Sequence, residues 1–257
     1  MRRALPLLAL VALAVLVLLV RGLDPAHLDP AVAWAGPSRA HPLGCAEAGA
    51  DVLSVVAASL VRGIVLAACV ALTGFGIGVP LGALVVYRRG VAERAVLRVC
   101  DLLQAFPSFL LALVILAAVR SPSRVHLYFV FALTAWAPFA RLAIVDGRVL
   151  REAAFVEAAR ALGRSAGQIV RLHIVPNLLP TTLVQLGSTA AAIVVSEAAL
   201  SFVGFGPKDG VSLGALIDQG VVSMQRAPHV LASGALAVFV SSRVLLYAAS
   251  RPGAADA

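Results

Sequence analysis

Long apolar runs, separated by short polar segments that carry arginine, organise this chain. A helix that crosses a bilayer needs roughly 17–25 predominantly apolar residues. Six runs have about this length, and they extend over Ala4–Val20, Gly63–Tyr87, Val99–Val119, Val125–Ile144, Asn177–Phe202 and Pro228–Ala249. The pattern therefore predicts an all-α, polytopic membrane protein with about six transmembrane helices.

The N-terminal part of the chain predicts one such helix followed by a loop. Residues 1–22 are expected to form a retained transmembrane helix. Arginines before an apolar run are also typical of a secretory signal, but this run is longer than the usual 7–15 apolar residues of a signal. Residues 23–52 contain four prolines and predict an extracytoplasmic loop.

The rest of the chain predicts a single transmembrane domain over residues 53–250. Leu53–Leu60 is expected to lie along the membrane surface, because Arg62 interrupts the apolar sequence after it. Residues 251–257 form the predicted cytoplasmic tail.

Composition and charge agree with a bilayer as the solvent. Hydrophobic residues make up 61% of the chain and charged residues 13%, against about 45–50% and about 25% in soluble domains. With the N-terminus inside, fourteen basic residues fall on the cytoplasmic side, six outside and one at a boundary. This distribution predicts that both termini and residues 152–176 are cytoplasmic. Nucleic acid is not an expected partner, because aromatic residues for base stacking are scarce among the arginines.

The polar segment in the middle of the chain predicts two short helices. Phe155, Ala158, Ala159 and Leu162 recur at helical spacing and indicate a narrow apolar face. Gly163 follows at the position where a helix often ends in a left-handed residue.

A second helix is predicted to follow at once. Ser165 begins a capping-box pattern with Gln168, and Pro176 is expected to end this helix. Two interpretations of the pair are open from the local sequence: it docks into a groove of another protein, or it adsorbs to lipid headgroups as an amphipathic connector.

The same segment carries a family signature. Glu157, Ala158, Ala159 and Gly163 in EAARALG, followed after nine residues by HIVP ending in Pro176, resemble the EAA motif of ATP-binding-cassette importer permeases. Other stretches resemble the C-type permease subunit of dipeptide, oligopeptide and nickel importers, namely HPLG from His41, DVLS from Asp51, DLLQAFPSFLLAL from Asp101 and SEAALSFVGFG from Ser196.

The resemblance implies the type I importer-permease fold with a cytoplasmic coupling helix pair at 152–176, here named the EAA segment. It favours docking and implies an ATPase-coupling role for Glu157, Ala158, Ala159, Gly163, Ser165 and Pro176. It also implies a bacterial inner-membrane protein that moves di- or oligopeptides, or a nickel complex. The expected partners are a second homologous permease, two P-loop ATPase subunits, an extracytoplasmic solute-binding protein and membrane lipid.

This chain is not expected to hydrolyse ATP or to bind a cofactor. A P-loop needs Gly-Lys followed by Ser or Thr, and the one lysine, Lys208, follows Pro207. ATP and Mg²⁺ are expected on the partner ATPases. No catalytic residue and no metal site is predicted here, since the five histidines stand apart from one another.

Two alternative functions remain open from the sequence. A passive channel would explain the spans but not the helix pair. A membrane-embedded serine hydrolase would use Ser212, because residues 210–214 match GxSxG; that motif needs a strand–turn–helix setting, which is missing here.

Several residues inside the spans are assigned either to the transport path or to helix packing. They are Glu197, Pro107 and Pro138, together with the glycines at 74, 76, 78 and 82. The prolines and glycines predict kinks and close helix contacts. For Glu197 the preferred interpretation is a carboxylate bonded to neighbours on its own helix or to a partner subunit.

Overall fold

The structure is a computed structural model that describes residues 5–21, 28–208 and 211–250. Within these ranges the chain is helical, and its one β-type contact is the isolated bridge between Cys45 and Asp51. The predicted all-α class is confirmed. The predicted cytoplasmic tail at 251–257, the first four residues, part of the predicted loop and Gly210 of the GxSxG match lie outside the described residues.

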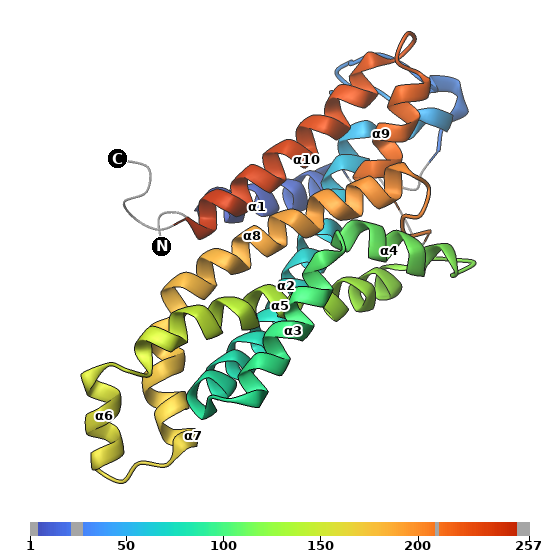
Figure 1. Cartoon of the computed structure of the whole chain (residues 1–257). Coiled ribbons are helices and arrows are strands. Elements are labelled where there is room, and N and C mark those ends of the chain that lie inside the picture. The colour runs from blue at the N-terminus through green and yellow to red at the C-terminus, as the bar shows by residue number, and fades with distance from the viewer. Residues whose placement is uncertain (1–4, 22–27, 209–210, 251–257) are drawn as a thin grey trace.

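The long helices run side by side, and short elements gather at the two ends of the molecule (Figure 1). The EAA segment lies at one end, here called the α6 end, and α9 lies at the other, here called the α9 end. The elements are α1 (Leu5–Arg21), η1 (Pro30–Val32), η2 (Glu47–Gly49), α2 (Val52–Arg88), α3 (Val91–Ala105), α4 (Ser108–Ala117), α5 (Arg124–Leu150), α6 (Ala154–Ala161), α7 (Ala166–Ile169), the π-helix η3 (Val170–Ile174), α8 (Val175–Phe202), α9 (Leu213–Val222) and α10 (Pro228–Ala249).

Four helices among the described residues are long and apolar enough to cross a membrane: α2, α5, the continuous run Ala166–Phe202, and α10. The pair α3 and α4 makes a fifth span if the bent pair is counted as one. The predicted number of about six includes α1, whose 17 residues stand at the lower limit of length for crossing a bilayer.

The predicted surface segment Leu53–Leu60 is wrong, because α2 runs without a break from Val52 to Arg88. Asp51 caps this helix by accepting a hydrogen bond from the Ser54 N–H at 2.9 Å. Arg62 does not interrupt α2: it is a good helix former, and its side chain is exposed.

The predicted span over Val99–Val119 is a bent pair of helices, and the predicted kink at Pro107 is confirmed. The helices α3 and α4 meet at Pro107 with a bend of 72°. Phe106 is extended there, with φ −98° and ψ 130°, because a residue before proline is driven out of the helical region. Pro138, by contrast, lies inside the unbroken helix α5.

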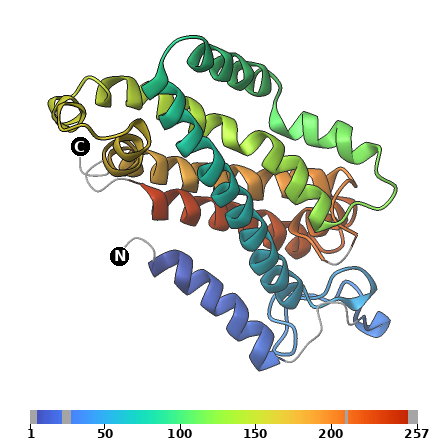
Figure 2. The same ribbon diagram turned by 90° about the horizontal axis from the view of Figure 1, so that it is seen from below.

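Glycines set the close approach of α2 to α5, which cross in Figure 2. A Cβ on Gly74 would lie 2.6 Å from the Ala135 carbonyl oxygen, and one on Gly78 would overlap the Trp136 carbonyl. Gly82 faces α5 in the same way. The predicted close contacts are confirmed at these three positions and are wrong for Gly76, which has open space around it.

Gly78→Ala is therefore expected to destabilise the protein, since overpacking costs about 1–3 kcal/mol. Gly76→Ala is the matched control on the same helix, and it should be neutral or stabilising by up to about 1 kcal/mol, because alanine favours a helix over glycine. The apparent melting temperatures of the two variants in detergent test this difference, and equal shifts would contradict the packing described here.

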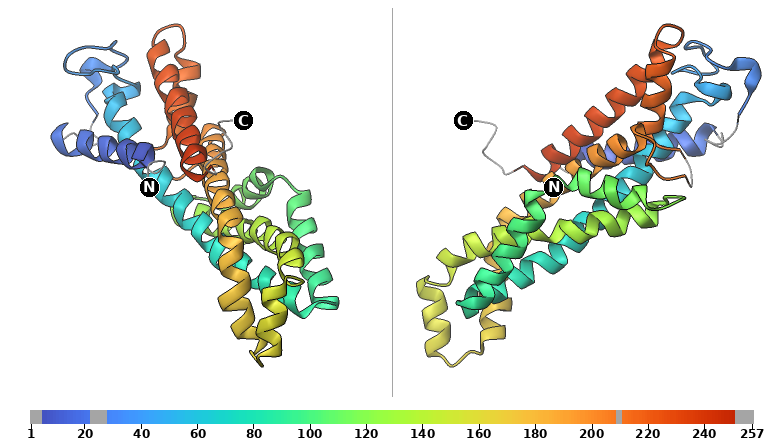
Figure 3. Two further views of the ribbon diagram at one scale, coloured as in Figure 1. Left: turned by 90° about the vertical axis from the view of Figure 1, so that its left-hand side faces the viewer. Right: turned by 45° about the vertical axis from the view of Figure 1, so that its right-hand side comes forward.

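A folded cap covers the α9 end. Residues 28–51 pack against α9 and the start of α10 (Figure 3). The imidazole Nδ1 of His41 lies 2.7 Å from a carboxylate oxygen of Asp51, and His229 Nε2 lies 3.3 Å from the carbonyl of Cys45. Both histidines thus join the loop to helices.

Candidate functional site

The EAA segment is anchored to the helical bundle by a small buried face on α6. Val156 and Ala159 are buried, and both belong to an apolar core at the α6 end. That core is completed by residues of α2, α5, α7, η3 and α8, namely Val79, Ala83, Phe139, Ala143, Ile169, Val170, Ile174 and Leu178. One apolar core therefore joins α6 to residues of three membrane helices.

An adjacent face of α6, roughly a quarter turn round the helix from the buried one, is apolar and exposed. Phe155 is 40% exposed and Leu162 80% exposed, and Ala158 between them is exposed as well. The predicted apolar face was wrong in its composition, because Ala159 turns inward while the other three residues turn outward. The sequence contains two apolar stripes on α6, and the stripe with Val156 is the one that fits the bundle. The outward stripe is available to another protein.

The end of α6 has the predicted geometry. Gly163 has φ +75°. This left-handed backbone conformation is strained for residues that carry a Cβ but not for glycine. Its N–H donates to the Arg160 carbonyl at 3.0 Å, and the Arg164 N–H donates to the Ala159 carbonyl at 3.1 Å. These two bonds form a Schellman motif, which fixes the direction in which the chain leaves the helix.

The start of α7 also follows the sequence prediction. The Ser165 N–H donates to the Gln168 side chain at 2.9 Å, and the Gln168 N–H donates to the Ser165 hydroxyl at 3.4 Å. The predicted capping box is therefore present. Gly163 and Ser165 together hold a tight connection at the tip of the α6 end.

Pro176, however, does not end the second helix. The π-helical element η3 continues α7 into α8, with the Val175 N–H donating to the Val170 carbonyl, and Pro176 stands in the first turn of α8. Pro176 has no N–H to donate, and the π-helical turn just before it shifts the hydrogen-bond ladder at this point. The Asn177 side chain donates to the His173 carbonyl at 2.6 Å. The EAA segment thus consists of the short helix α6 and the first turns of the long helical run Ala166–Phe202.

Aromatic contacts add to the anchoring of α6. The guanidinium of Arg160 lies 5.6 Å from the ring centroid of Tyr87, the penultimate residue of α2, within the range of a cation–π interaction. Hydrogen bonding to Tyr87 raises the pKa of the Arg160 guanidinium above its ordinary value. The rings of Phe155 and His173 lie 6.2 Å apart, so α6 contacts both the α2 end and η3.

A network of ion pairs at the base of the EAA segment was missed by sequence reasoning. Glu93 on α3 is buried and accepts hydrogen bonds from Arg148 Nε at 2.7 Å and Arg151 Nη1 at 3.1 Å. Arg151 also donates to the Val86 carbonyl at 2.9 Å. The only available signal was one acidic residue in the basic sequence YRRGVAERAVLR. We name Glu93, Arg148 and Arg151 the ion-pair cluster.

The cluster is extended by the first residue of the EAA segment. Glu152 pairs with Arg151 at 3.3 Å and with Arg89 at the end of α2. The ends of α2, α3 and α5 are therefore joined electrostatically at the place where the chain enters α6.

The predicted coupling residues fall into two groups. Glu157, Ala158, Gly163, Ser165 and Pro176 are exposed, and Glu157 forms no hydrogen bond or ion pair in the part of the chain that the structure describes. Ala159 is buried and belongs to the anchor. The exposed group shares one end of the molecule, as a docking surface requires; its coupling role stays a prediction.

Comparison with known proteins identifies the family. Residues 74–255 match the family described as "Binding-protein-dependent transport system inner membrane component". This chain belongs to that family of transport permeases. The recognised resemblance to importer permeases is thereby confirmed.

Two relatives of the permease illustrate its similarity. It is 31% identical over 207 residues to the glutathione transport system permease protein GsiD of Pectobacterium atrosepticum, covering 80% of this chain and 68% of the relative. It is 33% identical over 197 residues to the oligopeptide transport system permease protein OppC of Mycobacterium bovis, covering 76% and 67%. The prediction that the chain is a transport subunit and not an enzyme is confirmed.

The serine hydrolase alternative has no support in the permease. Ser212 is the N-cap of α9, and its hydroxyl accepts a hydrogen bond from the Ala215 N–H at 3.2 Å. The described residue before it is not in a strand, so the strand–turn–helix setting of a nucleophile elbow is missing.

Glu197 is buried in α8 of the permease, far along the helix from the EAA segment. The Ser201 hydroxyl donates to its carboxylate at 3.4 Å, and its other oxygen would lie 3.7 Å from a Cβ on Gly63 of α2. These contacts with its own and a neighbouring helix agree with a packing role. A role in the path is a prediction for Glu197, as it is for Pro107 and Pro138.

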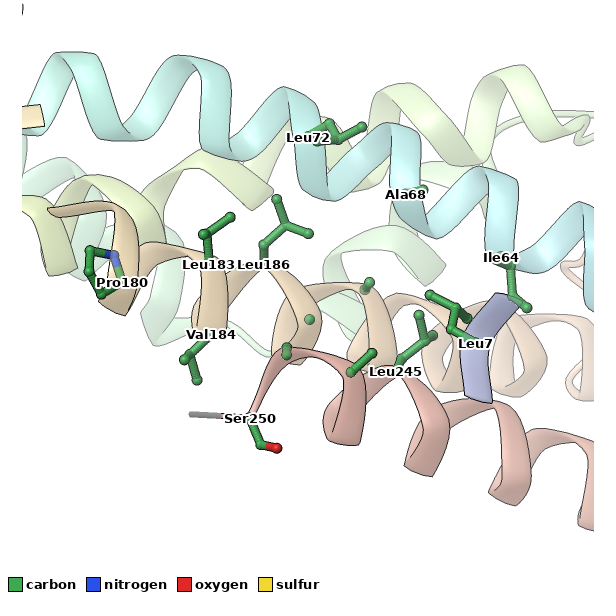
Figure 4. A pocket seen from close by; sticks show the side chains of 14 residues that line it. Leu7, Ile64, Ala68, Leu72, Pro180, Leu183, Val184, Leu186, Leu245 and Ser250 are labelled. Atoms are coloured by element: carbon green, nitrogen blue, oxygen red, sulfur yellow. The ribbon is translucent and has the colours of Figure 1, made fainter. Parts of the chain in front are cut away.

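An apolar cavity of about 560 Å³ lies between α1, α2, α8 and α10 (Figure 4). Leu7, Leu72, Leu183 and Leu245 project toward it from these four helices. Its lining is almost entirely hydrocarbon, so it offers few partners for the hydrogen-bonding groups of a peptide.

Proposed function

We propose that this permease is one subunit of an ATP-binding-cassette importer that moves peptides across the inner membrane. The observation that carries the proposal is the exposed stripe of Phe155, Ala158 and Leu162, mounted on a buried anchor at the α6 end. A helix that buries one face in its own bundle and presents another to solvent suits recognition by a groove in a second protein.

The chemistry of ATP is assigned to other subunits. Two P-loop ATPases, which bind ATP and Mg²⁺, would supply the free energy, and one of them would receive the EAA segment. A second homologous permease would complete the path. An extracytoplasmic solute-binding protein would deliver cargo at the α9 end, where the folded cap lies.

Coupling then follows from rigid contacts. When the ATPases close, their grooves would displace α6, and Val156 and Ala159 would carry α2, α5 and α8 with it, because packed interiors transmit displacement. The Schellman turn at Gly163 keeps the helix and the tip of the segment in a fixed relation. The result would be rocking of the bundle between outward and inward access.

The orientation of the permease is proposed from charge. The α6 end carries a dense group of arginines, including Arg88, Arg89, Arg94, Arg98 and Arg164. Basic loops are retained in the cytoplasm, so we place this end, and with it both chain termini, inside the cell.

Peptides are the preferred cargo over a nickel complex. Two of the most similar relatives carry glutathione and oligopeptide transport in their names, and both cargo classes are peptides with free carboxylates. In importers of this kind the binding protein sets much of the selectivity, so competition by Ni²⁺ salts against peptide uptake tests the remaining alternative.

Affinity purification of the tagged permease from its native membrane tests the assembly. Mass spectrometry should identify a second permease and P-loop ATPases in the same complex. The complex, reconstituted with its binding protein, should take up labelled peptide only when ATP is present. Recovery of the permease alone, under conditions that keep other membrane complexes whole, would contradict the proposal and favour a passive channel.

A further inference from the structure

The helix α3, at the edge of the bundle, has three different faces (Figure 2). One face packs on α5 and includes the buried residues Glu93 and Cys100. A second face is exposed and apolar, with Val99, Leu102 and Phe106. The third face is exposed and polar, and its members are Arg94, Arg98, Asp101 and Gln104. We name this third side the polar face of α3.

The polar face of α3 is joined to α5 by an ion pair. Arg141 Nη1 donates to Asp101 Oδ1 at 2.5 Å, and the two side chains are 48% and 52% exposed. Asp101 comes ten residues after Val91, where α3 begins, and Arg141 comes nine residues before Leu150, where α5 ends. At the helical rise per residue, both stand about 15 Å from the α6 end of their helices. The ion pair therefore lies within the length of the two spans and not at their ends.

The charges of this pair need a polar environment. A guanidinium has five N–H donors and a carboxylate has about four acceptor sites. Within the described ranges, Arg141 and Asp101 each make a single hydrogen bond, the one that joins them. Lipid tails offer no partner for the other donors and acceptors, and ionisable groups inside spans usually face a water-filled cavity or a protein partner. Because charged residues are depleted from the cores of protein interfaces, water is favoured here over a second subunit.

The backbone just beyond Gln104 also needs polar partners. At the 72° bend between α3 and α4, the N–H groups of Phe106 and Ser108 have no acceptor within the described ranges, and both residues are exposed. Irregular backbone at membrane depth is tolerated only where protein covers it or where it lines a water-filled cavity. The ion pair and the free backbone groups are independent observations, and both place water beside α3.

We propose that the polar face of α3 and the Asp101–Arg141 pair form a wall of the water-filled transport path, and that peptide cargo contacts the pair as it passes. A peptide carries a positive and a negative terminus, and the pair offers an opposite charge to each. An exposed ion pair adds little stability to a protein, so a charge on the cargo can compete for either member. This inference rests on the proposed peptide import.

Reciprocal charge variants test the contact with cargo. In the importer reconstituted with its binding protein, Arg141→Gln leaves Asp101 without its counter-charge. It should lower the uptake of an acidic dipeptide, alanyl-glutamate, relative to that of a basic one, alanyl-lysine. Asp101→Asn should shift the same uptake ratio in the opposite direction. Each shift should be about fivefold, the effect of one unit charge across about 4 Å of water.

The ratio separates contact with cargo from a structural role. The binding protein is the same in every assay, so its own preference cancels when each ratio is divided by that of the unmodified importer. A purely structural pair would change the uptake of both dipeptides by the same factor. Equal losses of the two dipeptides in Arg141→Gln and in Asp101→Asn would therefore overturn the inference.

Cysteine accessibility tests the water-filled wall without any cargo. Gln104 and Leu102 are both exposed, and they point to opposite sides of α3. In a Cys69→Ala background, where the remaining native cysteines are buried, each position is changed to cysteine. In inside-out vesicles that contain the assembled importer, a membrane-impermeant methanethiosulfonate should modify Gln104→Cys about tenfold faster than Leu102→Cys, because the reactive thiolate is disfavoured in apolar surroundings.

The outcomes distinguish this inference from the proposed function. Equal, slow modification at both positions, as expected if a second permease covers the polar face, would overturn the assignment of this face to the path even if peptide uptake is intact. Absence of ATP-dependent peptide uptake by the unmodified importer would instead contradict the proposed function. The relative reaction rates of Gln104→Cys and Leu102→Cys would then decide alone whether α3 borders water.

Discussion

Replacing Gly163 by proline is expected to abolish cargo-stimulated ATP hydrolysis while the permease still inserts into the membrane. Proline fixes φ near −65° and has no N–H, but Gly163 has φ +75° and donates to the Arg160 carbonyl. The Schellman turn cannot form, at a local cost on the order of 3 kcal/mol. The measurement is ATP turnover by the reconstituted importer with and without loaded binding protein.

Gly167→Ala is the matched control for this substitution. Gly167 lies four residues further along the same tip, has no positive φ and has open space where a Cβ would stand. Stimulated hydrolysis should be unchanged in this variant. Glu157→Lys should resemble Gly163→Pro, because it reverses the charge of an exposed side chain on the proposed docking face. Normal stimulation in both Gly163→Pro and Glu157→Lys would refute the coupling role.

Glu93→Ala is expected to weaken the inner end of the permease and to uncouple it. The substitution removes the carboxylate that pairs with Arg148 and Arg151, and Arg151, only 18% exposed, loses a counter-charge. Removing one partner of a largely buried pair is strongly destabilising, on the order of 3 kcal/mol. The apparent melting temperature of the variant and its stimulated ATP turnover are the two measurements.

Glu152→Gln separates this effect from a general loss of charge. Glu152 also contacts arginines, but it is 58% exposed, and exposed ion pairs contribute only about 0–1 kcal/mol. The melting temperature of Glu152→Gln is expected to be close to that of the unmodified permease. If Glu152→Gln and Glu93→Ala lowered the melting temperature equally, the ion-pair cluster would not be the element that joins α3 to α5.

Local sequence signals predicted part of the site correctly. The turn at Gly163 depends on the φ angle of one glycine, and the cap at Ser165 depends on two hydrogen bonds with Gln168. Both features involve only a few neighbouring residues, so the local sequence is enough to predict them. The three glycines that face α5 were also predictable, because small residues at a spacing of four mark one side of a helix.

The features that sequence reasoning missed depend on partners distant in the chain. On α6, Val156 and Phe155 are both apolar, and only the shape of the core decides that Val156 turns inward. Glu93 finds its arginines 55 and 58 residues further on. Pro176 was expected to stop a helix, but the π-helical turn before it shifts the hydrogen-bond ladder and lets the helix continue.

A photo-crosslinking residue at position 162 tests the central claim most directly, with position 222 as its control. Leu162 and Val222 are both apolar and are 80% and 85% exposed, but they lie at the α6 end and the α9 end. In the assembled importer, position 162 should crosslink to a P-loop ATPase and position 222 should not. Crosslinking of position 162 to lipid alone would contradict the account and return the EAA segment to the role of a membrane-surface connector.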